Sequence, residues 1–384
     1  MKVVVAIDSF KGSLSSAEAG NAVKAGVLSA IPDARVIVKP LADGGEGTTD
    51  ALIEGLGGTR IDLEVTGPMG TPVSAYYGYI PDQKTAVIEM ASAAGITLVP
   101  DAEKNPLVAT TYGVGEMILD AIRRGCRKFI IGIGGSATND GGAGMLAALG
   151  VLKALGFSFL DENGNDVGEG AQALSKIETI SAEGADPLLA DCQFQVACDV
   201  TNPLCGPNGA TYIYGPQKGV TKDLLLPIDQ GMAHYAKITA QATGTQYLEA
   251  PGAGAAGGLG FAFLSYLKAA LVPGIDLILN AIRLEEELSD ADVVVTGEGR
   301  LDHQTAMGKA PVGVARLARK YHATVLAFAG SVTKDASACN NAGIDAFFPV
   351  VRGVTTLEEA MDPQNAQENL RATAEQVFRL LALS

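Results

Sequence analysis

The chain lacks long apolar runs and has few cysteines, which limits the class of protein it can be. No stretch approaches the ~18 consecutive apolar residues of a membrane-spanning helix. The first apolar run, residues 3–7, is cut at Asp8 before it reaches the ~7–15 residues of a signal-peptide core. The five cysteines are odd in number and lack CxxC spacing, which argues against a disulfide framework and a zinc site. We therefore expect a cytoplasmic protein that contacts no membrane.

Positive charge is also scarce. The 28 Lys and Arg residues face 43 Asp and Glu residues, so the formal net charge is −15. No basic run is longer than the pairs Arg123-Arg124 and Arg127-Lys128, which argues against nucleic acid as a partner. The length of 384 residues and the 47% hydrophobic content predict a folded protein of two or three domains.

Glycine, in contrast, is abundant and clustered. The chain has 47 glycines in 384 residues, about 12% against a usual ~7%. The excess falls in four segments, residues 42–47, 132–142, 252–260 and 297–300. Loops of this kind allow backbone amides to approach a ligand closely.

Strand and helix patterns alternate at both ends of the chain and change in the middle. Residues 2–7 and 35–39 read as buried strands, and Ser15 with Glu18 has the spacing of a helix capping box. Residues 61–89 look antiparallel. Further strands are expected at 128–133, 193–197, 292–296, 324–329 and 346–349, and helices at 48–55, 141–150, 261–271, 311–321, 335–342 and 364–382.

This pattern predicts an α/β protein of two α/β domains. Residues 1–75 and 286–384 would form a discontinuous domain with a parallel sheet, and residues 76–285 an inserted domain with a mixed sheet. Ligands of such folds bind beyond the carboxyl ends of the strands and at domain interfaces, so we expect the active site in the cleft between the domains.

Acidic residues follow several predicted strands. Asp8, Asp43, Asp199 and Glu298 each lie at or just beyond the end of one, flanked by Gly, Ser or Asn. Residues 8–13 add Ser9 and the cation of Lys11 ahead of a helix, a suitable site for an anion, although helix capping explains part of the pattern. Further polar and glycine candidates near these acids are Gly44, Gly45, Glu46, Ser136, Thr138, Asn139, Asp140, Asn202, Arg300 and Asp302.

Each candidate loop also has a purely structural explanation. Residues 43–48 and 199–203 could be plain turns, and residues 134–142 a sharp turn from strand to helix. Arg300 could clamp a phosphate or carboxylate, or could pair internally with Glu298 or Asp302. Gly257 and Gly258 lie in a G-x-G-x-x-G segment that either wraps a nucleotide or packs a helix, since no clear strand precedes it.

Several familiar motifs are absent. No G-x-x-x-x-G-K-[ST] and no G-x-S-x-G occurs, and the three histidines lack the spacing of metal ligands. What remains is a set of carboxylates, isolated cations such as Lys11, Arg300 and Lys309, and glycine loops. Phosphoryl transfer needs these parts, with Mg²⁺ on carboxylates, cations and amides on phosphate, and an acid beside the acceptor hydroxyl.

Five segments, taken in order, resemble the bacterial glycerate kinase family of the glycerate 2-kinase type. They are DSFKGS (8–13), PLADGGEGT (40–48), GIGGSATNDGG (132–142), ACDVTNPL (197–204) and TGEGRLD (296–302). The resemblance runs from the first strand to the last helix. It implies ATP-dependent phosphorylation of D-glycerate to 2-phosphoglycerate, and a discontinuous Rossmann-like or flavodoxin-like domain with an inserted domain.

Catalytic roles are inferred from chemistry. We expect Lys11 and Arg300 to neutralise phosphate or the substrate carboxylate. Asp43, Glu46 and Asp199 are candidates both for holding Mg²⁺ and for activating the acceptor hydroxyl. Alternatives are a glycerate 3-kinase giving 3-phosphoglycerate, a Mg²⁺-dependent phosphatase or hydrolase acting on a small hydroxy acid, and a non-catalytic hinged binding protein. The oligomeric state is open, with a homodimer as one option.

Overall fold

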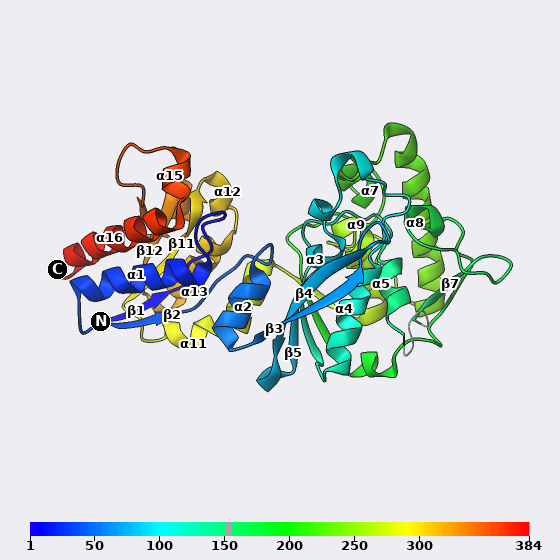
Figure 1. Cartoon of the computed structure of the whole chain (residues 1–384), viewed down its shortest axis with the longest axis horizontal. Coiled ribbons are helices and arrows are strands. Elements are labelled where there is room, and N and C mark those ends of the chain that lie inside the picture. The colour runs from blue at the N-terminus through cyan, green and yellow to red at the C-terminus, as the bar shows by residue number, and fades with distance from the viewer. Residues whose placement is uncertain (151–155, 384) are drawn as a thin grey trace. The chain divides into compact units, whose positions relative to one another are not determined.

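The computed structural model describes residues 1–150 and 156–383. The chain divides into two units, coloured along the chain in Figure 1. The first unit comprises residues 1–43, 50–57 and 275–384, and the second residues 44–49 and 58–274. The limits predicted from the sequence are 75/76 and 285/286. The first lies after the observed limit of 57/58, because residues 59–80 form two strands of the second unit's sheet, and the second lies after the observed limit of 274/275. No helix of the described residues is long and apolar enough to cross a membrane.

The first unit is built on a parallel sheet of five strands in the order β13-β12-β11-β1-β2. Its strands are β1 (Lys2–Val5), β2 (Arg35–Val38), β11 (Val293–Leu301), β12 (Thr324–Val332) and β13 (Ala346–Pro349). Counted within the unit, the order is 2-1-3-4-5, that of flavodoxin-like folds, whose ligands bind where the order reverses, between the first and third strands. Here that point lies between β1 and β11. The predicted parallel sheet at the chain ends is confirmed.

Helices pack on this sheet through its alternating apolar side chains. Val3, Val5 and Ile7 share one core with Leu370 and Phe378 of the last helix. The helices of the unit are α1 (Ser16–Ala30), α2 (Thr48–Leu56, whose first two residues belong to the second unit), α10 (Gly274–Ala281, whose first residue belongs to the second unit), α11 (Leu284–Leu288), α12 (His303–Ala306), α13 (Ala310–Ala318), α14 (Ala338–Asn341), α15 (Leu357–Met361) and α16 (Pro363–Leu381). The predicted capping box of Ser15 and Glu18 is present at the start of α1.

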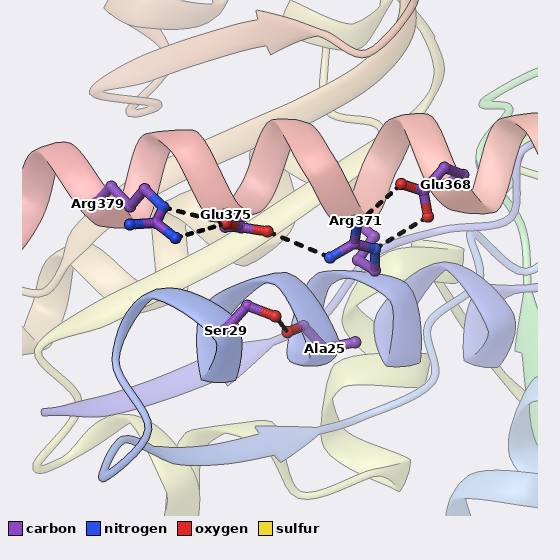
Figure 2. Close-up of polar contacts among 6 residues, drawn as sticks. All are labelled: Ala25, Ser29, Glu368, Arg371, Glu375 and Arg379. Atoms are coloured by element: carbon purple, nitrogen blue, oxygen red, sulfur yellow. Dashed lines mark hydrogen bonds and ion pairs between the residues drawn. The ribbon is translucent and has the colours of Figure 1, made fainter.

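Helices α1 and α16 lie side by side, although most of the chain separates them (Figure 1). Their contact is close at Gly26, where an added Cβ would lie 2.2 Å from the carbonyl oxygen of Arg371. On α16, Arg371 donates to Glu368 and Glu375, and Arg379 donates to Glu375 (Figure 2). These pairs all lie within α16 and do not join it to α1, so we attribute the association of the helices mainly to the buried apolar contact.

We expect Gly26→Ala to lower the free energy of unfolding by about 1–3 kcal/mol, because the added methyl group would force the two helices apart. Helix propensity alone predicts the opposite sign, a gain of about 1 kcal/mol. Urea denaturation decides between them. Ser29→Ala, at an exposed position one turn further along α1, is the control and should change stability by less than about 0.5 kcal/mol. A more stable Gly26→Ala variant would contradict the close packing.

The second unit contains a mixed sheet of six strands in the order β10-β9-β6-β5-β4-β3. Its strands are β3 (Thr59–Thr66), β4 (Pro72–Ile80), β5 (Thr85–Glu89), β6 (Lys128–Gly132), β9 (Gln193–Ala197) and β10 (Ala270–Val272), with β7 (Ser158–Leu160) and β8 (Thr179–Ser181) paired separately. The pairs β3–β4 and β4–β5 are antiparallel and the others parallel. Phe129 and Phe194 are register partners on β6 and β9, and their rings stack 4.8 Å apart.

The helices of the second unit are α3 (Ala91–Ala94), α4 (Tyr112–Arg123), α5 (Ala143–Ala148), α6 (Ala171–Leu174), α7 (Ala210–Tyr214), α8 (Lys222–Thr243) and α9 (Ala255–Leu267). The helix predicted at 261–271 is wrong at its end. Lys268 adopts a left-handed conformation that terminates α9, and residues 270–272 form β10 beside β9. The strand predicted at 292–296 is also too short, because β11 continues to Leu301 in register with β12.

Candidate functional site

A cavity of about 460 Å³ lies in the first unit, at the carboxyl ends of β1, β11, β12 and β13. Its polar lining comes from the loop after β1, from Asp43, from the end of β11 and the segment after it, and from Ser331 and Asn369. Eight residues predicted from the sequence line it: Asp8, Ser9, Lys11, Asp43, Glu298, Arg300, Asp302 and Lys309. The cavity therefore lies at the point where the strand order reverses, as expected for a flavodoxin-like sheet.

Three carboxylates shape the electrostatics of this cavity. Asp8 is only 7% exposed, and its burial, together with the negative charges of Asp43 and Glu298, raises its pKa to about 7. The backbone N–H of Ser9 donates to Asp8 Oδ1 at 2.7 Å and opposes this shift. Burial also raises the pKa of Glu298. Because the three groups repel one another, bringing positive charge among them is favourable.

Glu298 and Asp302 are also tied to the short helix α12. Thr305 Oγ1 donates to Glu298 Oε1 at 2.6 Å, and the backbone N–H of Thr305 donates to Asp302 Oδ1 at 3.2 Å. Asp302 is thus the N-cap of α12. These bonds fix the direction of the Glu298 carboxylate, which lowers the reorganisation needed when a ligand binds.

Cations reach the same cavity from three segments: Lys11 after β1, Arg300 on β11, and Lys309 before α13. Within the described part of the chain, Arg300 makes no ion pair with Glu298, and its ion pair with Asp302 is long, with Arg300 Nε 3.8 Å from Asp302 Oδ2. The Arg300 side chain is 66% exposed. Its guanidinium can therefore turn to a phosphate or carboxylate in the cavity with little loss of internal bonding.

No group of three or more His, Cys, Asp or Glu side chains within residues 1–150 and 156–383 is arranged to hold a metal ion. Mg²⁺ that accompanies a nucleotide usually takes only one or two protein carboxylates, with phosphate and water as its other ligands. The mutually repelling Asp8, Asp43 and Glu298 suit that coordination chemistry, because a divalent cation would relieve their repulsion.

The other predicted residues lie in the second unit. Gly44 lies at the carboxyl ends of its parallel strands, where an added Cβ would be 2.9 Å from the Cβ of Ala197 at the end of β9. Asp199 follows β9, is exposed, and accepts a hydrogen bond from the backbone N–H of Gly274 at 2.9 Å. Gly45 and Glu46 continue the loop. Gly44 is buried, Gly45 is partly exposed, and Glu46 is exposed. This edge therefore presents the Asp199 carboxylate to solvent.

The nitrogen and the oxygen of the Asn202 side-chain amide both make hydrogen bonds within the second unit. Its Nδ2 donates to the carbonyl oxygen of Asn208 at 2.8 Å, and its Oδ1 accepts from the hydroxyl of Tyr214 at 2.7 Å. The side chain therefore fixes the loop after β9 and holds α7 beside it.

Residues 134–142 form a largely buried turn. Gly134 and Gly135 are exposed, whereas Ser136, Thr138, Asn139 and Asp140 are buried. Asp140 Oδ2 accepts hydrogen bonds from the backbone and hydroxyl of Thr111, both at 2.8 Å, while burial raises its pKa. The backbone at Gly134 and Gly135 is thus the part of this loop open to a ligand, and the polar side chains behind it hold its shape.

Lys218, which the sequence patterns did not single out, makes buried hydrogen bonds to this turn. It is 2% exposed, and its Nζ donates to Ser136 Oγ at 2.6 Å and to the carbonyl oxygen of Thr138 at 2.7 Å. Burial lowers its pKa to about 7, an effect that the charge of Asp140 opposes. Its partners lie 82 and 80 residues away along the chain, so no local motif could reveal it.

Gly257 and Gly258 are buried against the same turn. An added Cβ at Gly257 would lie 2.0 Å from the carbonyl oxygen of Thr138, and its backbone already has a φ of +68°. The carbonyl oxygen of Gly257 accepts a hydrogen bond from the N–H of Gly141 at 3.0 Å. In this structure the G-x-G-x-x-G segment packs against residues 138–141.

We expect the free energy of unfolding to rise with pH more steeply in the unmodified protein than in Lys218→Met. The folded pKa of about 7 lies below the unfolded value of 10.5, so unfolding binds a proton between these values and becomes less favourable as the pH rises. The difference in slope between pH 7 and pH 9 should approach ~1 kcal/mol per pH unit in urea denaturation. Lys222→Met, at an exposed position nearby in the chain, is the control. Equal slopes would contradict the titration of Lys218.

The comparisons with known proteins all point to the same family. A family model described as the glycerate kinase family matches residues 3–382. A glycerate kinase of Bacillus subtilis is 47% identical over 384 residues, covering 100% of this chain and 98% of the relative. A glycerate 2-kinase of Escherichia coli is 45% identical over 383 residues, with coverage of 100% and 98%. The crystal structure of a candidate glycerate kinase 2 from Salmonella typhimurium matches with a TM-score of 0.91 and 44% identity, covering 100% and 98%.

Proposed function

Because the chain belongs to the glycerate kinase family of phosphotransferases, we propose that it transfers the γ-phosphoryl group of ATP to the 2-hydroxyl of D-glycerate. The products are ADP and 2-phospho-D-glycerate. The observation that carries the proposal is the cavity of the first unit, in which Lys11, Arg300 and Lys309 face a group of carboxylates. Position 2 is supported by the name of the E. coli relative, a glycerate 2-kinase.

The cations have a direct role in this reaction. In phosphoryl transfer, negative charge spreads over the oxygens of the transferred group, and positioned cations stabilise it. Lys11 and Lys309 would bind phosphate oxygens as point charges, and Arg300 could bind two oxygens at once through its planar guanidinium. The net charge of −15 repels a polyanion, so binding depends on these local cations.

The carboxylates would serve two purposes. One or two of Asp8, Asp43 and Glu298 would hold Mg²⁺ from the first unit, and Glu46 and Asp199 stay candidates from the second. When bound, Mg²⁺ neutralises phosphate charge and holds the phosphate chain in position. For the acceptor hydroxyl we propose Asp199, a carboxylate just beyond the end of β9, as the base, with Asp43, a carboxylate in the loop after β2 that lines the cavity of the first unit, as the alternative.

The test is a coupled assay of ADP release with ATP, Mg²⁺ and D-glycerate, followed by phosphorus NMR of the product. We expect ADP release that depends on glycerate and a doublet from a secondary phosphate ester. A triplet from a CH₂ ester would mean 3-phosphoglycerate and would move the base towards the terminal hydroxyl. Phosphate release without an acceptor would favour a hydrolase, and tight glycerate binding without turnover a binding protein. The cytoplasmic location and the homodimer stay predictions.

A further inference from the structure

The cavity of the first unit has an apolar half that the phosphate-binding residues do not use. Its wall is formed by Phe10, Val350, Leu357, Ala360, Met361 and Ala366, from the loop after β1, the end of β13, and helices α15 and α16. Phe10, Val350 and Ala366 are at most 4% exposed and so form a fixed floor. Glycerate carries a polar group on every carbon and gains nothing from such a wall, whereas a flat heteroaromatic ring does.

The size of the cavity also exceeds the needs of the acid. Its volume of about 460 Å³ falls in the ~300–1,000 Å³ range of sites for cofactor-sized ligands. The cations lie at β1 and β11, most of the apolar wall comes from the end of β13 and from α15 and α16, and Phe10 beside Lys11 joins the two parts. The lining spans the ends of four neighbouring strands, β1, β11, β12 and β13, at ~4.8 Å between strands, which suits a ligand larger than a three-carbon acid.

The two ends belong to one continuous surface. An added Cβ at Gly12 would lie 2.9 Å from Cε of Met361, so the loop that carries Lys11 contacts the helix that supplies part of the apolar wall. Arg300 on β11 and Ser331 on β12 are register partners and both line the cavity, so the lining continues from the charged end on β11 to β12, the neighbour of β13. A ligand can therefore contact the cations and the apolar wall at the same time.

One polar side chain lies at the apolar end. Asn369 of α16 lines the cavity, is half-buried, and its amide has no hydrogen-bond partner among the residues that the structure describes. A carboxamide offers one acceptor and a donor side by side, the pattern that pairs with the N6 and N7 atoms of adenine. In sites of this kind a few polar groups placed in a mostly apolar lining, Asn among them, fix the orientation of the ligand.

We propose that the first unit is the nucleotide-binding unit, with the adenine of ATP against the Phe10–Val350–Met361 wall, hydrogen-bonded by Asn369, and its phosphates directed to Lys11 and Arg300. This inference rests on the proposed kinase activity and adds the location of the base. It assigns to residues 350–369 a function in ATP affinity that is separate from glycerate binding.

Filling the apolar end should weaken ATP binding selectively. We expect Ala360→Trp to raise the KM for ATP at least tenfold, with the KM for glycerate and kcat within about twofold of the unmodified enzyme. Asn369→Leu, which keeps the size of the side chain, should raise the KM for ATP in the same way. Glu358→Trp is the matched control, since it places the same bulky ring on α15 at an exposed position that does not line the cavity.

Photolabelling of the full-length unmodified protein with 8-azido-ATP tests the location without any variant. We expect ATP-protected label in peptides covering residues 350–369. Label confined to peptides of the second unit, or a rise in the KM for glycerate with an unchanged KM for ATP in Ala360→Trp, would overturn the inference while leaving the kinase activity intact. If no ADP is released with glycerate, the proposed function fails, and the labelled peptide still decides where the base binds.

Discussion

Arg300→Ala should lower kcat/KM for phosphoryl transfer by about 10²–10³-fold, the usual effect of removing one preorganised group that stabilises transition-state charge. Arg300 lines the cavity, and its ion pair with Asp302 is long, at 3.8 Å. Its loss should therefore affect the reaction more than the fold. Steady-state kinetics with ATP and D-glycerate measure the effect, and thermal unfolding should shift by no more than a degree or two.

Two further substitutions sharpen this test. Arg300→Lys keeps the charge but not the planar pair of donors, so it should recover only part of the activity if Arg300 binds two oxygens at once. Arg283→Ala removes an equally exposed arginine that pairs loosely with Glu286 and does not line the cavity, so its activity should be unchanged. Near-normal kcat/KM in Arg300→Ala would show that Arg300 does not stabilise the charge of the transition state. Lys11 and Lys309 would then be the remaining phosphate ligands.

Asp199→Asn should lower turnover by ~10²-fold or more, because an amide cannot accept the proton of the acceptor hydroxyl. The substitution keeps the size of the side chain, and the amide oxygen can still accept the hydrogen bond from the N–H of Gly274. Stability and the KM for glycerate should thus change little. Single-turnover kinetics with ATP and glycerate isolate the chemical step.

The matched control is Asp191→Asn, an exposed carboxylate just before β9 on the same segment of the chain. It should leave turnover unchanged. If Asp199→Asn retains near-normal turnover, Asp199 is removed as the base, and Asp43→Asn becomes the next variant to measure. If Asp199→Asn also unfolds enough of the protein to account for the lost turnover, Asp199 would instead have a structural role at the end of β9.

Much of the fold was predictable because its signals are local. The apolar run after Met1 and the Ser15–Glu18 spacing specify a strand and a capped helix over a few residues. Two boundaries were wrong for a non-local reason. β11 extends to Leu301 because β12 provides register partners as far as Val332, and residues 270–272 are a strand because β9 lies beside them. Pairing partners distant in sequence thus decided where these elements end.

By itself, the sequence determined the α/β class, the acidic residues at strand ends and, through five ordered segments, the family. Only the tertiary structure decided which of those residues share a cavity: Asp8, Asp43 and Glu298 do, together with Lys11 and Arg300. It also revealed Lys218 behind the 134–142 turn and Asn369 at the apolar end of the cavity. Hydrophobic periodicity and capping act over one or two turns of chain, whereas these positions depend on strand order and burial, which are properties of the whole packed unit.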